Sequence, residues 1–589
     1  MYRAPVADIA FTLKHVAGLD GALAEGRFGD LSADLVEAIL SEAGRFASEE
    51  VAPLAEVGDR HGTPWADGLV TMPPGWKELY RHWHEGGWNA LTGPEAYGGQ
   101  GLPAMLAVAT FEMWNAASLS FGLGPTLTVG AVEALARHGS DELKARYLEK
   151  LVSGEWMGTM NLTEPQAGSD LNALKTRAER AGDGSYRIFG QKIFITYGEH
   201  DLTENIIHMV LARLPDAPAG TRGISLFLVP KFLPDGNRND VFCAGVEKKL
   251  GIHGSPTCTM LYGDGKFGDD EPGAVGWLVG EENRGLNCMF TMMNNARLMV
   301  GIEGVAIAEA AFQKALAYAR ERRQGRAPGW QGEGMSPIVE HPDIQRTLLT
   351  MKALAQGARA ICYACAHALD MARVREGEEA RRWQERAYLL TPVTKAYSTY
   401  IGVEVATLGI QVHGGMGFIE ETGAARLLRD SRIAPIYEGT NGIQAIDLVT
   451  RKLPLSEGGA VASYLDELRV IADEVGRSNR PGLRSATECL SAALDDLEAA
   501  TAFLSETLAK GDTKAALAGA TPYLRLFGLA ASGAYLAKGA LAEDGAGEAR
   551  ASLYAFAAEN LLGETAALRR AVEKGVESLQ HAGVALTAE

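Results

Sequence analysis

One carboxylate stands out as a candidate for chemistry, Glu438, within residues 429–444 (RDSRIAPIYEGTNGIQ). It follows a short apolar run and precedes a glycine and a segment that favours the start of a helix. A carboxylate held in a dry site is a suitable general base for a weak carbon acid, because burial raises its proton affinity. The competing interpretation is that Glu438 only stabilises the positive end of the following helix.

Two segments rich in small or hydroxyl-bearing residues come earlier in the chain. Residues 160–170 (MNLTEPQAGSD) contain glycine, serine and threonine, which let a backbone approach a ligand closely. Taken alone, this segment is equally typical of a surface turn. Residues 191–196 (QKIFIT) place Phe194 and Thr196 in a predicted strand, where one core aromatic would be the ordinary interpretation.

Three further patterns could contact anionic groups. Asn294 and Arg297 lie on a long predicted helix, and Arg322 and Gln324 stand at its basic end, where an arginine on its own is usually solvated. The glycines of residues 411–418 (QVHGGMGF) suit backbone approach to a phosphate or an adenine. A G-G-x-G pattern on its own is weak evidence.

The surrounding elements change character along the chain. From about residue 35 to 150, apolar residues recur at steps of three and four, which predicts helices. Residues 158–279 change to short segments with a period of two, which predicts a small β-domain. In GISLFLVP, for example, Ile224, Leu226 and Leu228 point one way.

The helical period returns after residue 285 and continues to about residue 453, where LPLSEGGA marks a soft boundary. The last block, from about residue 461, is again helical. A stripe that should be buried runs through it at steps of three and four: Leu524, Phe527, Ala531 and Tyr535.

Bulk composition is that of a soluble globular protein. The chain has 589 residues, of which 47% are hydrophobic and 22% charged, and a formal net charge of −18. This charge argues against nucleic acid as a partner, because phosphate-backbone binding needs a concentrated basic face. There is no run of about 18 apolar residues and no N-terminal targeting pattern, so we expect no membrane association and a cytoplasmic location.

Six cysteines are present, and Cys362 and Cys365 have C-x-x-C spacing within a helical run. No second pair completes a zinc site, so no metal centre is expected. Small core residues are a better interpretation than a redox pair.

Taken together, four separated motifs and the helix–sheet–helix layout resemble the acyl-CoA dehydrogenase family over about residues 36–452. The motifs are residues 160–170, QKIFIT, the NNAR and ARERRQG helix, and QVHGGMGF, followed by IYEGT. The resemblance implies a mainly α fold with a central β-domain, in which a helical domain, a barrel-like β-domain and a helical bundle are followed by a C-terminal helical domain. The expected division is 1–35 (N-terminal extension), 36–157, 158–280, 281–453 and 460–589.

The resemblance also implies FAD as cofactor and a homodimer that shares it. Residues expected at the flavin are Met160, Leu162, Thr163, Gly168, Ser169, Phe194, Thr196, Gly439 and Thr440. Residues expected to reach FAD in the neighbouring subunit are Arg322, Gln324, Gln411, Gly414 and Gly415. Phe194 stands where the family often has tryptophan, so an indole N–H is replaced by an aromatic face alone.

By the same resemblance, Glu438 is the base that removes the α-proton of an acyl-CoA thioester while the β-hydride leaves for the flavin. Substrate contacts are expected from Ser169, Asn294, Arg297, Glu438 and Gly439. Asn294 replaces the acid usual at its position, and Gly325 with Arg326 stands where the family has Phe-Gly. Electrons are expected to pass to an electron-transferring flavoprotein.

Within the family, the chain resembles along its full length the branch that acts on 3-(methylthio)propanoyl-CoA (3-methylmercaptopropionyl-CoA), in the breakdown of dimethylsulfoniopropionate. A thioether sulfur and a methylene differ little in polarity, and one methylene discriminates by only about 1–3 kcal/mol. Alternatives are a general medium- or long-chain fatty acyl-CoA dehydrogenase, an acyl-CoA oxidase that reduces oxygen, and a non-catalytic protein that binds CoA or flavin.

Overall fold

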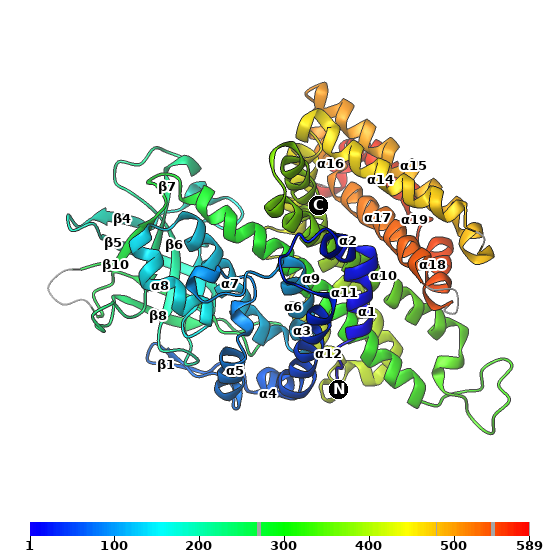
Figure 1. Ribbon diagram of the computed structural model, residues 1–589, viewed down its shortest axis with the longest axis horizontal. Coiled ribbons are helices and arrows are strands. Elements are labelled where there is room, and N and C mark those ends of the chain that lie inside the picture. The colour runs from blue at the N-terminus through cyan, green and yellow to red at the C-terminus, as the bar shows by residue number, and fades with distance from the viewer. Residues whose placement is uncertain (268–271, 479, 544–547, 588–589) are drawn as a thin grey trace.

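The computed structural model describes residues 1–267, 272–478, 480–543 and 548–587. Figure 1 shows the β-domain at one end, long helices in the middle, and a further group of helices packed against them at the other end. The expected fold class is confirmed, since the chain is mainly helical with a central β-domain and an additional C-terminal helical domain.

Helices form the N-terminal block, as predicted. Ser32 caps the first long helix by accepting a hydrogen bond from the Leu35 N–H at 3.2 Å. The helices are α1 (Val6–Phe11), a π-helical turn (Thr12–Val16), α2 (Leu19–Ala24), α3 (Ala33–Phe46), α4 (Ala55–His61), α5 (Trp76–Glu85), α6 (Ala104–Ala117), α7 (Leu119–His138) and α8 (Asp141–Ser153). A two-stranded hairpin, β1 (Trp65–Ala66) with β2 (Leu69–Val70), interrupts them.

One helix in the described part of the chain, α7, is long and apolar enough to cross a membrane by length and composition. However, 89% of its most apolar stretch is buried inside the protein. Packing in the core of the N-terminal block therefore accounts for its composition.

The β-domain closes on itself. Its strands are β3 (Met157–Asn161), β4 (Arg177–Arg180), β5 (Tyr186–Thr196), β6 (Ile206–Arg213), β7 (Ile224–Pro230), β8 (Val241–Val246), β9 (Thr257–Tyr262) and β10 (Ala274–Val279). The order β10-β7-β6-β4-β5 returns to its start because β10 also pairs with β5. The ring leaves these five strands without a free edge, while β9 and β8 continue from β5 and β3 pairs with β6.

Strand β7 shows how this domain is packed on both faces. Ile224, Leu226 and Leu228 lie in one hydrophobic cluster, as the period of two predicts. Phe227 and Val229 point the other way, into the main core of the protein. The whole strand is buried, so its alternation separates two cores rather than a core from solvent.

Three long helices form the bundle that follows. Its elements are α9 (Gly285–Glu321), α10 (Pro342–Val374), α11 (Gly377–His413), α12 (Ala424–Ser431) and α13 (Asn441–Asp447). Helices α9 and α11 have 37 residues each, about 55 Å. They approach closely at Gly304, where a Cβ atom would lie 2.2 Å from the Ser398 carbonyl oxygen. Cys362 and Cys365 are buried on α10, and all six cysteines are free, which fits the core interpretation.

The C-terminal block packs onto this bundle and onto the N-terminal segment. Its helices are α14 (Gly459–Gly476), α15 (Pro481–Ala509), α16 (Thr513–Ala518), α17 (Ala520–Ala542), α18 (Ala549–Asn560) and α19 (Glu564–Ala582). The predicted stripe on α17 is buried as expected. Helix α17 lies against α10 and α11, and it also contacts α13, the helix that follows Glu438.

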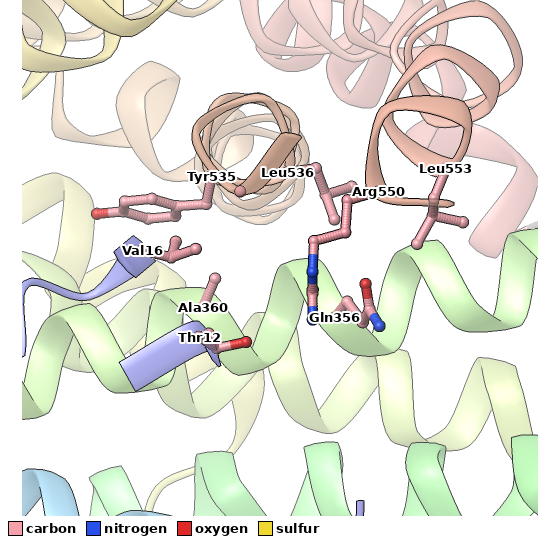
Figure 2. Close-up of a pocket in the computed structure, with 9 residues that line it drawn as sticks. Thr12, Val16, Gln356, Ala360, Tyr535, Leu536, Arg550 and Leu553 are labelled. Atoms are coloured by element: carbon pink, nitrogen blue, oxygen red, sulfur yellow. The ribbon is translucent and has the colours of Figure 1, made fainter. Parts of the chain in front are cut away.

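The first residues of the chain are held between α10 and the last helices. Figure 2 shows Thr12 and Val16 beside Gln356 and Ala360 of α10, with Tyr535 and Leu536 of α17 on the other side. The cavity among them is small, ≈ 20 Å³. Nearby, Arg550 of α18 pairs with Asp8 at 2.6 Å and stacks over the Phe11 ring at 3.7 Å. The N-terminal extension is therefore part of the folded core.

Candidate active site

Glu438 lies in the loop between α12 and α13, in a left-handed backbone conformation with φ 55°. This conformation is uncommon for a residue with a Cβ atom. The loop is fixed on its far side, because the Glu438 carbonyl oxygen accepts a hydrogen bond from Gln444 Nε2 at 3.0 Å. Thr440, not Glu438, caps α13 by accepting from the Ile443 N–H at 3.2 Å. The side-chain cap of α13 therefore comes from Thr440, and the described structure gives Glu438 no capping hydrogen bond.

The carboxylate of Glu438 is only partly satisfied. Its Oε2 atom is buried and has no hydrogen-bond partner among the described residues. Burial raises the pKa of Glu438, and the positive charges of Arg297 and Lys395 counter part of this effect. A carboxylate with a raised pKa and an unused oxygen is suited to accept a proton.

Arg297 projects from α9 toward this carboxylate. Its Nη1 donates to Asn294 Oδ1 at 3.5 Å, and its guanidinium lies 5.9 Å from the centre of the Phe290 ring. Its Nε is buried without a partner in the part of the chain that the structure describes. Arg297, which is hydrogen-bonded to Asn294, and Glu438 are thus brought together beside the N-terminal half of α9, although 144 positions separate Asn294 from Glu438.

Two charged residues that sequence reasoning missed complete this group. Lys395 of α11 is buried and donates to the Gly439 carbonyl at 2.7 Å and to Asn441 Oδ1 at 3.0 Å. Glu303 of α9 is buried and accepts a hydrogen bond from the Tyr437 hydroxyl. A sequence signal existed, since Glu303 and Lys395 are single charges in VGIEGVA and VTKAYS, runs of otherwise uncharged residues.

Burial shifts both of these charged groups. It lowers the pKa of Lys395 to about 7, against the opposing effect of Glu438 and Glu303. It raises the pKa of Glu303 to about 8, with the neighbouring Glu438 adding to the rise. Ionisable groups shifted toward neutrality in one small region are typical of catalytic sites.

The loop after β3 is folded around a buried ion pair. Lys192 Nζ donates to Glu164 at 2.9 Å and to the Leu162 carbonyl at 3.0 Å. Burial opposes ionisation of Glu164, but Lys192 and hydrogen bonds from Thr176 and the Lys175 N–H bring its pKa down to about 2. The pair fixes residues 160–170 against β5, where the Ile193 N–H also donates to the Thr163 carbonyl at 2.9 Å.

Phe194 sits at a bulge in β5, where the pairing with β9 shifts between Lys192 and Ile195. Its φ is 60°, and 58% of its surface is exposed. A large aromatic in a left-handed conformation costs of order 1–3 kcal/mol. Such a ring presented to the outside, beside a fixed loop of small residues, is suited to contact a planar ligand.

The remaining predicted residues lie at the other end of α9 and α11. Exposed side chains or backbone are found at Arg322, Gln324, Gln411, Gly414 and Gly415. The two segments meet where Tyr318 stacks on His413, with ring centroids 4.5 Å apart. Along α9, residue 322 is about 37 Å from residue 297. Within one chain, therefore, these residues are not part of the site around Glu438.

Burial also differs among the residues predicted at the flavin. Met160 is buried in β3, and Gly168 and Ser169 are exposed at the tip of the loop. The residues of intermediate exposure are Leu162, Thr163, Thr196, Gly439 and Thr440. In the described residues, His, Cys, Asp and Glu side chains form no group of three or more that could hold a metal ion.

Comparison with known proteins matches almost the whole chain to one family. The N-terminal domain of acyl-CoA dehydrogenase matches residues 34–155, the middle domain 159–264 and the C-terminal domain 283–453. A fourth match, acetyl-CoA dehydrogenase C-terminal like, covers residues 464–582.

Individual relatives match most of the chain. It is 46% identical over 551 residues to 3-methylmercaptopropionyl-CoA dehydrogenase of Ruegeria pomeroyi, covering 92% of this chain and 91% of that protein. It is 35% identical over 522 residues to a broad-specificity linear acyl-CoA dehydrogenase of Mycobacterium tuberculosis, covering 85% and 83%. A solved acyl-CoA dehydrogenase complexed with FAD, from Bacillus anthracis, has a TM-score of 0.74 at 22% identity, covering 97% and 92%.

Proposed function

Because the chain belongs to the acyl-CoA dehydrogenase family, we propose that it oxidises 3-(methylthio)propanoyl-CoA to 3-(methylthio)acryloyl-CoA, with Glu438 as the base. The observation that carries this proposal is the Glu438 carboxylate, which has a buried, unpartnered oxygen and lies near two cations. The substrate is suggested by the relative from Ruegeria pomeroyi, which covers both chains almost completely.

The residues of this chain fit FAD, the cofactor of the family. Phe194 offers an exposed aromatic face, and residues 160–170 offer small side chains with amide and hydroxyl donors. A flavin ring needs these two features, a stacking surface and hydrogen-bond donors along its edge. Thr163, Ser169 and Thr196 are the side chains that would donate. When bound, FAD supplies the acceptor for the β-hydride of the substrate.

Glu438 acts as the general base, which accepts the α-proton of the thioester. The α-C–H is a weak acid, so the carboxylate must be both ionised and poorly solvated. Arg297 and Lys395 favour the ionised form, while burial of Oε2 leaves that oxygen poorly solvated. We assign polarisation of the thioester oxygen to the backbone N–H of Glu438, an oxyanion-type interaction that stabilises the developing enolate.

Lys395 holds the loop in the required position. Its ammonium group bonds the Gly439 carbonyl on one side and Asn441 on the other, so the residue after the base cannot rotate freely. These two hydrogen bonds restrain the backbone next to Glu438, and so the direction of its side chain, before substrate binds. Proton transfer requires such preorganisation.

The substrate proposal is tested by the visible spectrum of the purified protein. We expect the absorption of oxidised flavin, and its bleaching under anaerobic conditions by 3-(methylthio)propanoyl-CoA. Measuring kcat/KM for this thioester against butanoyl- to palmitoyl-CoA decides between the proposal and a general fatty acyl-CoA dehydrogenase. A preference for chains of twelve carbons or more would overturn the substrate assignment, and an absence of bleaching by every thioester would point to a non-catalytic binding protein.

The electron acceptor is a separate proposal. We expect an electron-transferring flavoprotein to reoxidise the reduced protein, and oxygen to do so slowly. Comparing turnover with that flavoprotein against peroxide formation in air distinguishes a dehydrogenase from an oxidase. Rapid formation of peroxide would favour the oxidase. We place the protein in the cytoplasm as a homodimer, in the breakdown of dimethylsulfoniopropionate.

A further inference from the structure

A second buried acid lies behind the base. Glu303 is one of the 37 residues of α9, two turns beyond Arg297, and 1% of its surface is exposed. Its Oε2 accepts the hydrogen bond from Tyr437, the residue immediately before Glu438. Its Oε1 is buried with no partner in the described chain. A buried acid with one unused oxygen is costly unless the structure has a use for it.

A second polar cluster on the same helix differs from this one. Glu309 lies six residues further along α9 and shares Arg359 with Glu112, at 2.9 and 2.6 Å. The carboxylate of Glu112 is bonded through both oxygens, to Arg359 and to the Tyr363 hydroxyl. That cluster joins three helices of the core and is explained by structure alone. Glu303, by contrast, has the loop of the base as its hydrogen-bonded partner.

The contact has a direct geometric consequence. Tyr437 precedes a residue in a left-handed conformation, and such a conformation persists only when its surroundings impose it. The loop is already held after the base, by Lys395 on Gly439 and Gln444 on the Glu438 carbonyl. Before the base, the Tyr437 N–H donates to the Ile433 carbonyl at 3.2 Å, and the Tyr437 hydroxyl on Glu303 adds a side-chain restraint. Glu438 is therefore held from both sides.

We propose that Glu303 is a positioning residue for the reaction, which acts through the Tyr437 hydroxyl to hold Glu438 in its left-handed conformation. The inference rests on Glu438 being the base. It assigns no contact with substrate to Glu303 itself. Ionisable groups that face Glu303 are Lys395 from α11 and Tyr437 and Glu438 from the loop.

The test compares variants that break the hydrogen bond with one that keeps it. Tyr437→Phe removes the donor, Glu303→Leu removes the acceptor, and Glu303→Gln retains an oxygen that can accept. We expect kcat to fall about tenfold in the first two, the loss of one hydrogen bond to a charged or polar acid. The double variant should lose no more than either alone, because both act through one contact. Glu303→Gln should keep most of the native kcat at pH 7.

A matched control is available on α11. Tyr397 is a buried tyrosine whose hydroxyl accepts a hydrogen bond from Ser532 at 3.2 Å and, among the described residues, makes no hydrogen bond to residues 436–441. Tyr397→Phe should leave kcat unchanged. Hydrogen exchange of the amides of residues 436–441, measured without substrate, gives a second readout. Exchange should quicken in Tyr437→Phe and Glu303→Leu, and stay native in Tyr397→Phe and Glu303→Gln.

The outcomes separate this inference from the proposed function. Glu303→Leu exchanges a buried acid for an apolar group, so a merely structural role predicts unchanged kcat with unchanged or higher Tm. That result, or fully additive losses, would overturn the inference. Glu438→Gln serves as the reference: if it is inactive while the Glu303 and Tyr437 variants are native in rate and exchange, only the positioning role fails. If Glu438→Gln remains active, the assignment of the base fails first.

Discussion

Two regions of α9, around Arg297 and around Arg322, carry residues predicted from the same family resemblance. They differ in burial, in pKa shifts and in hydrogen bonding. Around Arg297, Glu303 and Lys395 are buried, and several polar atoms have no partner in the described chain. Burial shifts the pKa values of Glu303, Lys395 and Glu438 toward their neutral forms. Around Arg322 the side chains are exposed and bonded only locally, as in the Arg322 contact with Gln324 at 3.3 Å. The region around Arg297 is an organised site within one chain. The region around Arg322 is an exposed surface, too far from Glu438 to belong to that site, and it is available only for contact with another molecule.

This difference explains why FAD binding and proton transfer should respond to different substitutions. A change near Arg297 alters the chemistry of each chain by itself. A change near Arg322 should alter only FAD binding by the partner copy in the proposed homodimer. Variants in the two regions therefore test whether the regions act separately.

The largest effect is expected at Glu438. Replacing it with glutamine removes the proton acceptor while keeping the shape, so kcat should fall about 10²–10⁴-fold. The flavin spectrum should remain, because the residues around Phe194 are unchanged. Stopped-flow bleaching with substrate measures the loss. Retention of more than a tenth of the native rate would contradict the role of Glu438.

A smaller effect, and one that depends on pH, is expected at Arg297. Its positive charge lowers the pKa of Glu438 against the raising effect of burial. Arg297→Gln should therefore raise that pKa further, because burial is then opposed by Lys395 alone. The base works when ionised, so activity is lost as pH falls through its pKa, and the acid limb of kcat/KM should move to higher pH. Profiles measured from pH 5 to 9 would reveal the shift. An unmoved limb would mean that Arg297 does not act on the base.

At the other end of α9, we expect an effect on FAD without an effect on the base. Arg322→Ala should weaken FAD retention about tenfold, the contribution of one charge-assisted contact. The acid limb of kcat/KM should stay in place. Flavin content after dialysis measures the change, and added FAD should restore activity. Arg320→Ala, an exposed arginine in the last turn of α9, is the matched control and should behave as the native protein.

The smallest effect concerns stability. Gly414 has φ 60° and ψ −141°, a conformation nearly restricted to glycine, although open space surrounds the position of its missing Cβ. Gly414→Ala should destabilise the protein by about 1–3 kcal/mol. Thermal unfolding measures this change. Gly415→Ala, where φ is not positive and a Cβ would also meet open space, should have no measurable effect on Tm.

Much of the fold could be predicted because it follows local patterns. The period of two in GISLFLVP and the stripe on α17 are visible in short windows, and both are confirmed. Glu438 was identifiable because its loop carries a compact pattern, but the roles of the site residues stay predictions until variants are measured.

The rest of the site depends on contacts between distant parts of the chain. Glu303 and Tyr437 are separated by 134 positions, so no local pattern links them. The bulge that turns Phe194 outward is set by its register against β9, and the closure of the barrel by the pairing of β10 with β5. The separation of Arg322 from Arg297 becomes visible only when the long helix is seen as one rigid element.

The contacts that α17 and α18 make with the N-terminal segment have a consequence for the order in which the protein folds during synthesis. Asp8 and Phe11 are held by Arg550, and Val16 lies against α17, so residues made early bind to residues made much later, with 542 positions between Asp8 and Arg550. Domains generally fold in the order of their synthesis. Here the contacts of this segment with Ser48, Glu37 and α10 can form first, but those with α17 and α18 must wait until translation has passed residue 550. Packing around the segment is thus completed only after the helices that follow the catalytic bundle have been made.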